Sequence, residues 1–514
     1  MWVIGHLEGS GKTALALRGR GIDSRQMNIA RGLSLPPRPG KRVASIAIPV
    51  GLEFILILGL GLVNQIVVGG LGDSAVAAVG FANALNLIPM FALNSIGLAA
   101  GVVVARAYGG GHRHLVNTST SSAIVLAVSL ALLISIPFVL FPDSILRFAG
   151  ASDTVIAEGS MYLALILVSL PAVTVGQVLG GVLRSVDHPR SPMVATIISV
   201  VVNTPLAIIF VYGWGPIPAF GVVGAGIATL ASHIVKALIL LFQTYWLFDI
   251  ADWDLPSKAK NWVRILKPIL TLALPLALTS LAWTSGNFLY NVVVQQLGDG
   301  PLAAVQVVSA VAPVFVVGSL GLSSAITVLA GQAVGQEDAG LVTQWTRYIF
   351  RIGIGTSLIF GTLFALSSLT LPTLYPELSP EVVASAQVGV LISAAMQPVI
   401  VRMLLHAAVL PSGNDTTGII IGDIAGPFLF GLPLTIVLSF FTPLAVVGAF
   451  IGRAAEDTVK LAVFSFRSRR INWERVVTKH VESVALIGDP RTGPILIGED
   501  PGIDVDFSDE AKKN

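Results

Sequence analysis

Twelve long apolar runs divide the chain, and each is interrupted only by isolated polar residues. A helix that crosses a bilayer needs about 20 mostly apolar residues. The pattern therefore predicts twelve membrane-spanning helices in two groups of six. The first group lies near 44–70, 76–106, 117–141, 156–183, 192–213 and 219–247, and the second near 268–296, 302–333, 344–370, 381–409, 417–439 and 443–465.

Polar segments around these runs define the expected domains. We predict a basic, flexible leader at 1–42, a six-helix bundle at 43–248, a polar linker at 249–267, a second bundle at 268–466 and a polar tail at 467–514. The tail has scattered charge and no strong periodicity, which is typical of a disordered segment or of a short amphipathic helix.

Composition supports a membrane protein and excludes some chemistry. The chain is 54% hydrophobic and only 12% charged, whereas soluble domains are about one quarter charged. It contains no cysteine, which excludes disulfides, thiolate metal sites and thiol catalysis. The net charge is only +2, so its distribution matters more than its sum.

Lysine and arginine gather on one side of the predicted bilayer, as they do in cytoplasmic loops. The leader is basic, and the opposite loops "LGDS", "GWGPIPAFG", "LGDG" and "FFTP" carry neither residue, with the loop around Arg147 as the exception. We therefore predict a multi-pass protein of the plasma (inner) membrane with both termini cytoplasmic. Further basic residues follow the even-numbered helices: Arg106, Arg113, Arg184, Arg190, Lys258, Lys260, Arg264, Arg347 and Arg351.

The two halves of the chain repeat each other. "LGDSAVAAV" (71–79) follows the first helix, and "LGDGPLAAV" (297–305) follows the seventh at an offset of 226 residues. "ARAYG" (105–109) and "GQAVG" (331–335) keep that offset. Because each half has an even number of helices, both enter the membrane from the same side and the repeats are parallel. Internal repeats with a binding site between them are typical of secondary transporters.

These segments make the chain similar to the multidrug and toxic compound extrusion (MATE) family of exporters over about 43–465. The resemblance is carried by "VGGLGDSAVAAVG" and its repeat, by the turns "ARAYGGGHR" and "GQAVGQED", and by "LRSVDHPRSPMVATIISVVVNTPLAIIFVYG" and "GVVGAGIATLAS". It implies two six-helix bundles in a V shape around a substrate cavity. It also implies export of small organic, cationic or amphipathic compounds, driven by proton or sodium entry. Flippases for lipid-linked precursors, which belong to the same superfamily, are the alternative.

Ionisable and polar residues inside the first bundle are candidate sites, because a charge in hydrocarbon costs about 3 kcal/mol on insertion scales. Glu53 lies in the first helix, and Asn64, eleven residues later, shares its face. The family resemblance implies an Asp at Asn64, and an Asn followed four residues later by an Asp at Asn203 and Ala207. Both acids are absent, so coupling either uses Glu53 or has moved to the second half.

In the second bundle, Asp423 of the eleventh helix is the acid that we favour for coupling. The alternative is a counter-ion to Arg402, which shares a face of the tenth helix with His406. Glu456 and Asp457 also lie inside a predicted helix. Because Arg453 precedes Glu456 by three residues, we favour a structural ion pair within the twelfth helix.

The seventh helix carries a polar stripe. Asn287, Asn291 and Gln295 recur every four residues, and Tyr290 borders them. Such a stripe can line a cavity, and it can also make hydrogen bonds between helices. We keep Asn287, Tyr290 and Asn291 as candidate substrate- or ion-binding residues, with both interpretations open.

A nucleotide-driven protein is the remaining class to weigh, because "GHLEGSGKT" (5–13) is similar to a phosphate-binding loop. That loop needs a glycine where this chain has His6. We therefore predict a transporter and not an enzyme, with no cofactor and no metal site beyond the coupling proton or sodium ion. The expected partners are membrane lipid and a small-molecule substrate, with no nucleic acid, and the protein is expected to be a monomer.

Overall fold

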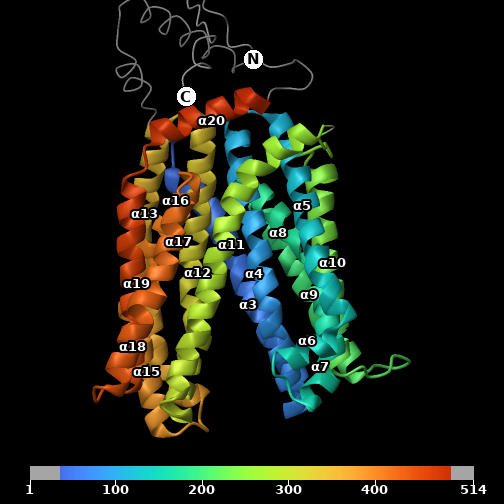
Figure 1. Cartoon of the computed structure of the whole chain (residues 1–514), viewed down its shortest axis with the longest axis vertical. Coiled ribbons are helices and arrows are strands. Elements are labelled where there is room, and N and C mark those ends of the chain that lie inside the picture. The colour runs from blue at the N-terminus through green and yellow to red at the C-terminus, as the bar shows by residue number, and fades with distance from the viewer. Residues whose placement is uncertain (1–34, 257, 488–514) are drawn as a thin grey trace, which may run out of the picture.

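The computed structural model describes residues 35–256 and 258–487. The segment "GHLEGSGKT" lies outside the described residues, as does the last part of the predicted tail. Within the described part the chain makes twelve helical passes in two lobes, which confirms the predicted all-α membrane fold (Figure 1).

The twelve passes follow one another along the chain as two sets of six, as the repeat predicts. The first six are α3 (Pro39–Gly69), α4 (Asp73–Gly109), α5 (Arg113–Leu140), α7 (Asp153–Val168) with α8 (Leu170–Ser185), α9 (Arg190–Tyr212), and α10 (Val222–Phe242) with the π-helix η1 (Gln243–Leu247). The next three are α11 (Ala259–Gln295), α12 (Asp299–Gly335), and α13 (Ala339–Ser367) with η2 (Ser368–Thr370) and α14 (Leu371–Leu374). The last three are α15 (Pro380–Ala395) with α16 (Gln397–Ser412), α17 (Thr416–Ile424) with the π-helix η3 (Ala425–Gly431) and α18 (Leu432–Phe440), and α19 (Val446–Arg469). Two further helices, α6 (Pro142–Phe148) and α20 (Trp473–Ile487), do not span.

Hydropathy alone accounts for most of these passes. Ten helices in the described part are long and apolar enough to cross a membrane, and the α15–α16 pair, bent by 52°, makes an eleventh. The twelfth pass is α19, which is 24 residues long but carries four charged residues near its middle: Arg453, Glu456, Asp457 and Lys460. Charged residues in the middle of a membrane helix are costly, so α19 is a candidate functional helix.

Helices α3 and α11 cross from one lobe to the other. Val43, Ile46 and Val50 in the first half of α3 pack into a core with α12, α13 and α16, whereas Val67 and Val68 near its end pack into the core of α4–α10. Helix α11 does the reverse: its first half packs with the first lobe and its last part with the second. The first lobe is hereafter α4–α10 with the part of α3 from Glu53 onward, and the second lobe is α12–α19 with the last part of α11.

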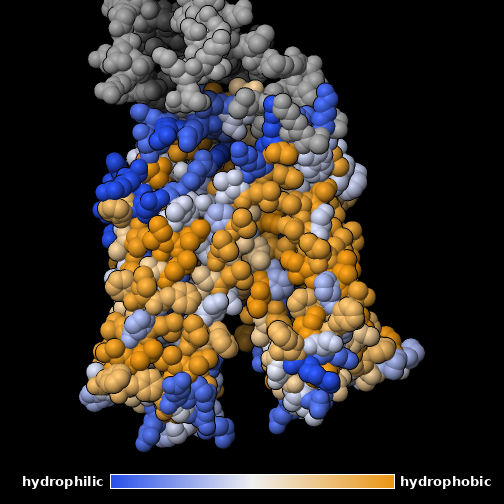
Figure 2. Space-filling view, viewed as in Figure 1, coloured by the Kyte–Doolittle hydropathy of each residue, from blue (hydrophilic) through white to orange (hydrophobic). Residues whose placement is uncertain are grey.

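One end of the bundle is closed and the other is open. Helix α20 lies across the closed end, hereafter the α20 end, and the lobes separate towards the opposite end, hereafter the open end (Figure 1). Figure 2 shows the hollow between the lobes at the open end and the largely apolar surface that both lobes present on this face.

The chain beyond the last span is helical rather than unstructured as far as Ile487. Helix α20 confirms the amphipathic alternative for the part of the tail at 473–487. Its Trp473, Val476 and Val477 pack against the core that joins α3 to the second lobe, and its Val484 packs against the first-lobe core. The helix therefore contacts both lobes where they meet.

Candidate functional site

Two aromatic side chains meet between α4 of the first lobe and the crossing helix α11. Phe91 of α4 and Trp283 of α11 meet edge to face, with ring centroids 5.7 Å apart. Trp283 is still 42% exposed. An exposed aromatic face can bind planar and cationic ligands, so this contact is a candidate surface for substrate.

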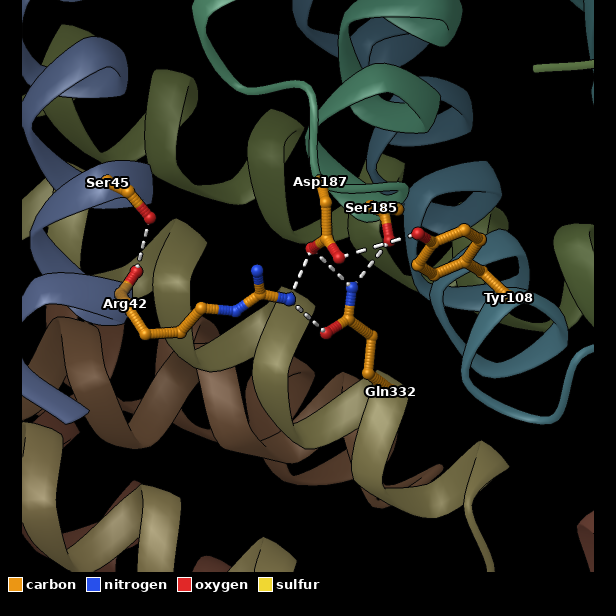
Figure 3. Close-up of polar contacts among 6 residues, drawn as sticks. All are labelled: Arg42, Ser45, Tyr108, Ser185, Asp187 and Gln332. Atoms are coloured by element: carbon orange, nitrogen blue, oxygen red, sulfur yellow. Dashed lines mark hydrogen bonds and ion pairs between the residues drawn. The ribbon is translucent and has the colours of Figure 1, made fainter. Parts of the chain in front are cut away.

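The α20 end is sealed by a hydrogen-bond group centred on Gln332 of α12 (Figure 3). Its amide nitrogen donates to the backbone oxygen of Ser185 at 2.9 Å and to Asp187 Oδ1 at 3.0 Å, both in the first lobe. Arg42 of α3 pairs with the same Asp187 oxygen at 2.6 Å and approaches Gln332 Oε1 at 3.4 Å. Tyr108 reaches Asp187 Oδ2 at 3.5 Å. Gln332 thus ties the second lobe to the loop between α8 and α9.

Arg106 of α4 makes the same contact in the opposite direction. It donates to the backbone oxygen of Ser412 at 2.9 Å and to Asn414 Oδ1 at 3.0 Å, in the loop between α16 and α17. Positions 106 and 332 are related by the repeat, and Ser185 and Asp187 correspond to Ser412 and Asn414. Asp187 and Asn414 even share a left-handed backbone, with φ of 69° and 59°. The two lobes are therefore held together by two pseudosymmetric locks, hereafter the Gln332 lock and the Arg106 lock.

Glycine allows the helices to approach closely between these locks. A Cβ atom at Gly109 would overlap the Gln332 carbonyl, and a Cβ atom at Gly335 would overlap the Arg106 carbonyl. The pair again obeys the repeat. The small residues of "ARAYG" and "GQAVG" thus pack backbone against backbone across the lobe interface.

Helix α20 covers the Arg106 lock. Burial, together with the neighbouring Arg106 guanidinium and His112, lowers the pKa of His480 to about 4. The Nε2 atom of His480 is buried without a hydrogen-bond partner. The imidazole is therefore neutral at pH 7 while α20 stays in place.

Glu53 lies in an ion-pair group inside the first lobe. Its carboxylate contacts Arg184 of α8 at 3.0 Å and Lys236 of α10 at 3.2 Å, and it accepts a hydrogen bond from Thr196 of α9 at 3.3 Å. Glu53 is 7% exposed. One carboxylate facing two cations leaves this group with a net charge of +1, so Glu53 is firmly held in its ionised form.

The two candidate asparagines, Asn64 of α3 and Asn203 of α9, make no contact with the ion pairs of Glu53. Asn203 is fully buried and donates to Ser232 at 3.3 Å, while its Oδ1 has no partner. The Oδ1 of Asn64 is also buried without a partner. Ala207 is buried at 1% exposure. The first lobe therefore offers amide oxygens at these positions and no titratable group.

The polar stripe of α11 makes hydrogen bonds between helices. Asn287 accepts a bond of 2.6 Å from Arg453 of α19, and Asn291 accepts one of 3.3 Å from Gln306 of α12. Tyr290 is 6% exposed, and the Arg453 guanidinium lies 5.7 Å from its ring centroid. Of the two interpretations that the sequence left open, helix-to-helix bonding accounts for both asparagines.

Asp423 belongs to a charged group in the second lobe, and its counter-ion is Lys460 rather than Arg402. Lys460 lies 3.4 Å from Asp423 and 2.8 Å from Glu456. Arg402 is exposed, so the suggested Asp423–Arg402 pair is wrong. His406 bonds to Ser468 at 2.7 Å and packs on Phe350.

The predicted pair within α19 is confirmed, because Arg453 and Glu456 lie 3.6 Å apart. Three acids, Asp423, Glu456 and Asp457, face two bases, so the group carries a net charge of −1 when all are ionised. These five residues are hereafter the second-lobe cluster.

The repeat connects the ionic groups of the two lobes. Helices α10 and α19 align at an offset of 224 residues, which places Lys236 opposite Lys460 and His233 opposite Asp457. Sequence analysis missed both lysines as partners of the candidate acids. Extending the repeat to the last helix of each half would have found them.

Comparisons with known proteins agree with this architecture. A family model described as MatE matches residues 49–209 and 275–437. The chain is 27% identical over 427 residues to "Probable multidrug resistance protein NorM" of Synechocystis sp., covering 79% of this chain and 89% of that protein. It is 24% identical over 428 residues to "Multidrug resistance protein NorM" of Vibrio cholerae, covering 81% and 92%.

Solved structures show the same fold. A MATE crystal structure in the bent conformation superposes with a TM-score of 0.77 at 21% identity, covering 87% of this chain and 98% of that one. An outward-facing multidrug resistance MATE family transporter superposes with a TM-score of 0.76 at 22% identity and the same coverage. The chain belongs to the MatE family of membrane transporters.

Proposed function

We propose that this protein exports small organic compounds, cationic or amphipathic, by cation antiport with alternating access. The observation that carries the proposal is the bundle that is sealed at one end and hollow at the other. Two lobes related by a repeat can exchange these states by breaking the two locks and closing the open end. The names of the NorM relatives, which describe multidrug resistance proteins, point the same way.

We infer that the α20 end faces the cytoplasm. The loops and helix ends at the open end of the described chain carry seven acids and one base, Arg147. The other end holds most of the arginines and lysines, including those of α20. Basic residues favour the cytoplasmic side. Under this assignment the structure is outward-facing, and both termini lie in the cytoplasm of a cell whose plasma (inner) membrane holds the protein.

Trp283 and Phe91 are the residues that we propose for binding aromatic substrate. Cationic dyes combine a flat ring with a delocalised charge, which suits an exposed indole. Helix α11, which carries Trp283, also carries Asn287, Tyr290 and Asn291, whose contacts are with helices of the second lobe. We propose that these three residues fix the position of α11 rather than contact substrate. Asn64 and Asn203 remain candidates in the first lobe.

The ionic groups favour this function over a flippase for lipid-linked precursors. Binding a pyrophosphate needs cations free to contact it. In the first lobe Arg184 and Lys236 share Glu53, and in the second Arg453 and Lys460 share Glu456. Each of these four cations already contacts a carboxylate, so a phosphate would have to compete with that carboxylate for the contact.

Reconstitution into liposomes tests the proposal. We expect ethidium to be transported against its gradient when a proton or sodium gradient is imposed, and we expect Trp283→Ala to raise the dye's KM about tenfold with little change in kcat, which corresponds to about 1.4 kcal/mol. Leu274→Ala, an exposed residue of the same helix, is the control. Lipid scrambling without dye transport would instead establish the flippase, and dye transport that needs ATP would contradict both.

A further inference from the structure

We propose that the second-lobe cluster is the proton site of this transporter and that Asp457 is the carboxylate that takes up the proton. This inference rests on the proposed antiport. It names a residue that the sequence pattern favours as structural, and its evidence lies in the contacts of α19.

The charge count of the cluster requires a further cation. Lys460, at 3% exposure, is shared between Asp423 and Glu456, and Arg453 pairs with Glu456. Asp457 makes no hydrogen bond or ion pair with any other residue of the described chain. A carboxylate left in this position inside a bilayer is unfavourable unless it is neutralised, and one proton makes the cluster neutral.

An unpartnered polar group beside the cluster points to the same place. The hydroxyl of Tyr290 is buried without a hydrogen-bond partner, although its ring lies under the Arg453 guanidinium. The described residues contain no group of three His, Cys, Asp or Glu side chains arranged to hold a metal ion. Arg453 and Lys460 already contact the carboxylates of Asp423 and Glu456, so the oxygens of these two acids are engaged by cations, and a proton on the remaining carboxylate fits this arrangement.

The repeat explains why this site lies in only one lobe. At the position of Asp457 the first lobe has His233, which bonds to Ser169 at 3.0 Å. The first-lobe group already carries +1, so adding a proton there would increase an uncompensated charge. The same scaffold has opposite sign in the two lobes, and only the negative one attracts a proton.

The cluster is connected to elements that can move. Its neighbour η3 is a π-helix with Gly426 and Gly431 against Lys460 and Glu456, and it holds one residue more than the matching part of α9. π-Helical turns are often found at functional sites. Arg453 also donates to Asn287 of α11, the helix that crosses between the lobes. Proton uptake at Asp457 releases attraction on Arg453 and Lys460, and both contacts can transmit the change.

The other charged groups near α19 have defined places. Of the elements packed against α19, α17 contributes Asp423, and α15 carries Glu381 in its first turn at the open end. Helix α16 contributes His406, bonded to Ser468, and the exposed Arg402. No charged residue lies in the described η3 or α18. The balance at Asp457 is therefore set by Asp423 and by the residues of α19 itself.

Two transport modes of one reconstituted variant test the inference. Asp457→Asn is expected to lose at least tenfold of dye transport driven by an imposed pH gradient, and to keep gradient-free dye exchange within about twofold. Purified wild-type protein in weak buffer should take up one more proton than Asp457→Asn between pH 8 and pH 5. The exposed Asp143→Asn at the open end serves as the matched control and should behave as wild type.

The outcomes separate the two proposals. Wild-type protein that transports no dye under any gradient contradicts the proposed function and this inference with it. If the wild type is pH-driven and Asp457→Asn is equally pH-driven, only the proton site is wrong. Loss of both modes in a variant that elutes as folded protein would make Asp457 structural, which also contradicts the inference. Asp423→Asn should show the same split between modes, because without the Asp423 charge the cluster is already neutral while Asp457 is ionised.

Discussion

Removing the Gln332 lock should open the α20 end without harming the fold. Gln332→Leu keeps the shape of the side chain and loses its bonds to the Ser185 carbonyl and the Asp187 carboxylate. A neutral hydrogen bond contributes about 1 kcal/mol and one to a charged group about 2 kcal/mol. The closed end should thus lose about 3 kcal/mol, which changes its ratio to the opened form by on the order of 100-fold.

Distance measurements between two spin labels by pulsed electron paramagnetic resonance can follow the opening of the α20 end directly. The chain contains no cysteine, so spin labels attached at Arg190→Cys and Arg347→Cys report one exposed position in each lobe near the α20 end. We expect a long-distance population to appear in Gln332→Leu at pH 7. Gln306→Leu, which removes an exposed hydrogen bond on the same helix, should leave the distribution as in the wild type.

The repeat supplies a second, stricter comparison. Arg106→Leu should open the same end, whereas Arg106→Gln should retain closure, because Gln332 already makes the equivalent contact in the other lobe. A distance distribution that stays unchanged in Gln332→Leu would refute the reasoning. Equal opening in Arg106→Gln and Arg106→Leu would show that the locks are not equivalent.

Three further changes follow from named contacts. Glu53→Gln should destabilise the protein by about 3 kcal/mol in detergent thermal unfolding, because it leaves Arg184 and Lys236 close together without a carboxylate; an unchanged Tm would contradict the buried pairing. Gly335→Val should open the α20 end in the same distance measurement, since a Cβ atom there overlaps the Arg106 carbonyl, whereas Gly355→Val, which faces open space, should not. Undocked His480 titrates near 6.5 and docked His480 near 4, so docking of α20 is fully favourable above about pH 6.5 and is lost as the pH falls towards 4. A spin label at Glu482→Cys should accordingly gain mobility at pH 5, and His480→Gln should remove that pH dependence.

Hydropathy and the repeat predicted the fold because both can be recognised in the sequence without knowing which helices contact each other. Each apolar run is long enough for a pass, and the even number of passes in each half sets parallel repeats. The boundary after the first bundle was harder to predict from the sequence. The range 249–267 was expected to be a polar linker, yet α11 already begins at Ala259. Polar residues at the end of a long helix outside the bilayer look like a loop in a hydropathy pattern.

The same reasoning from the sequence predicted only some of the contacts in the candidate site. Spacing within one helix identified the Arg453–Glu456 pair, because residues three apart are neighbours on a helix. Pairing between helices has no such period, so Lys460 was missed as the partner of Asp423, and Arg402 was given that place instead. The locks were missed for a different reason. A glutamine or arginine at a helix end resembles an ordinary loop residue until the opposing carbonyl is known.

The two halves have matching residues at the α20 end, where the lobes meet, and differ in their ionic groups. Gln332 and Arg106, Ser185 and Ser412, and Gly109 and Gly335 occupy matching places at the α20 end. The ionic groups instead have opposite sign, with net charges of +1 and −1. Under the proposed proton site, this asymmetry means that a single proton neutralises the second-lobe cluster and leaves the charge of the first-lobe group unchanged.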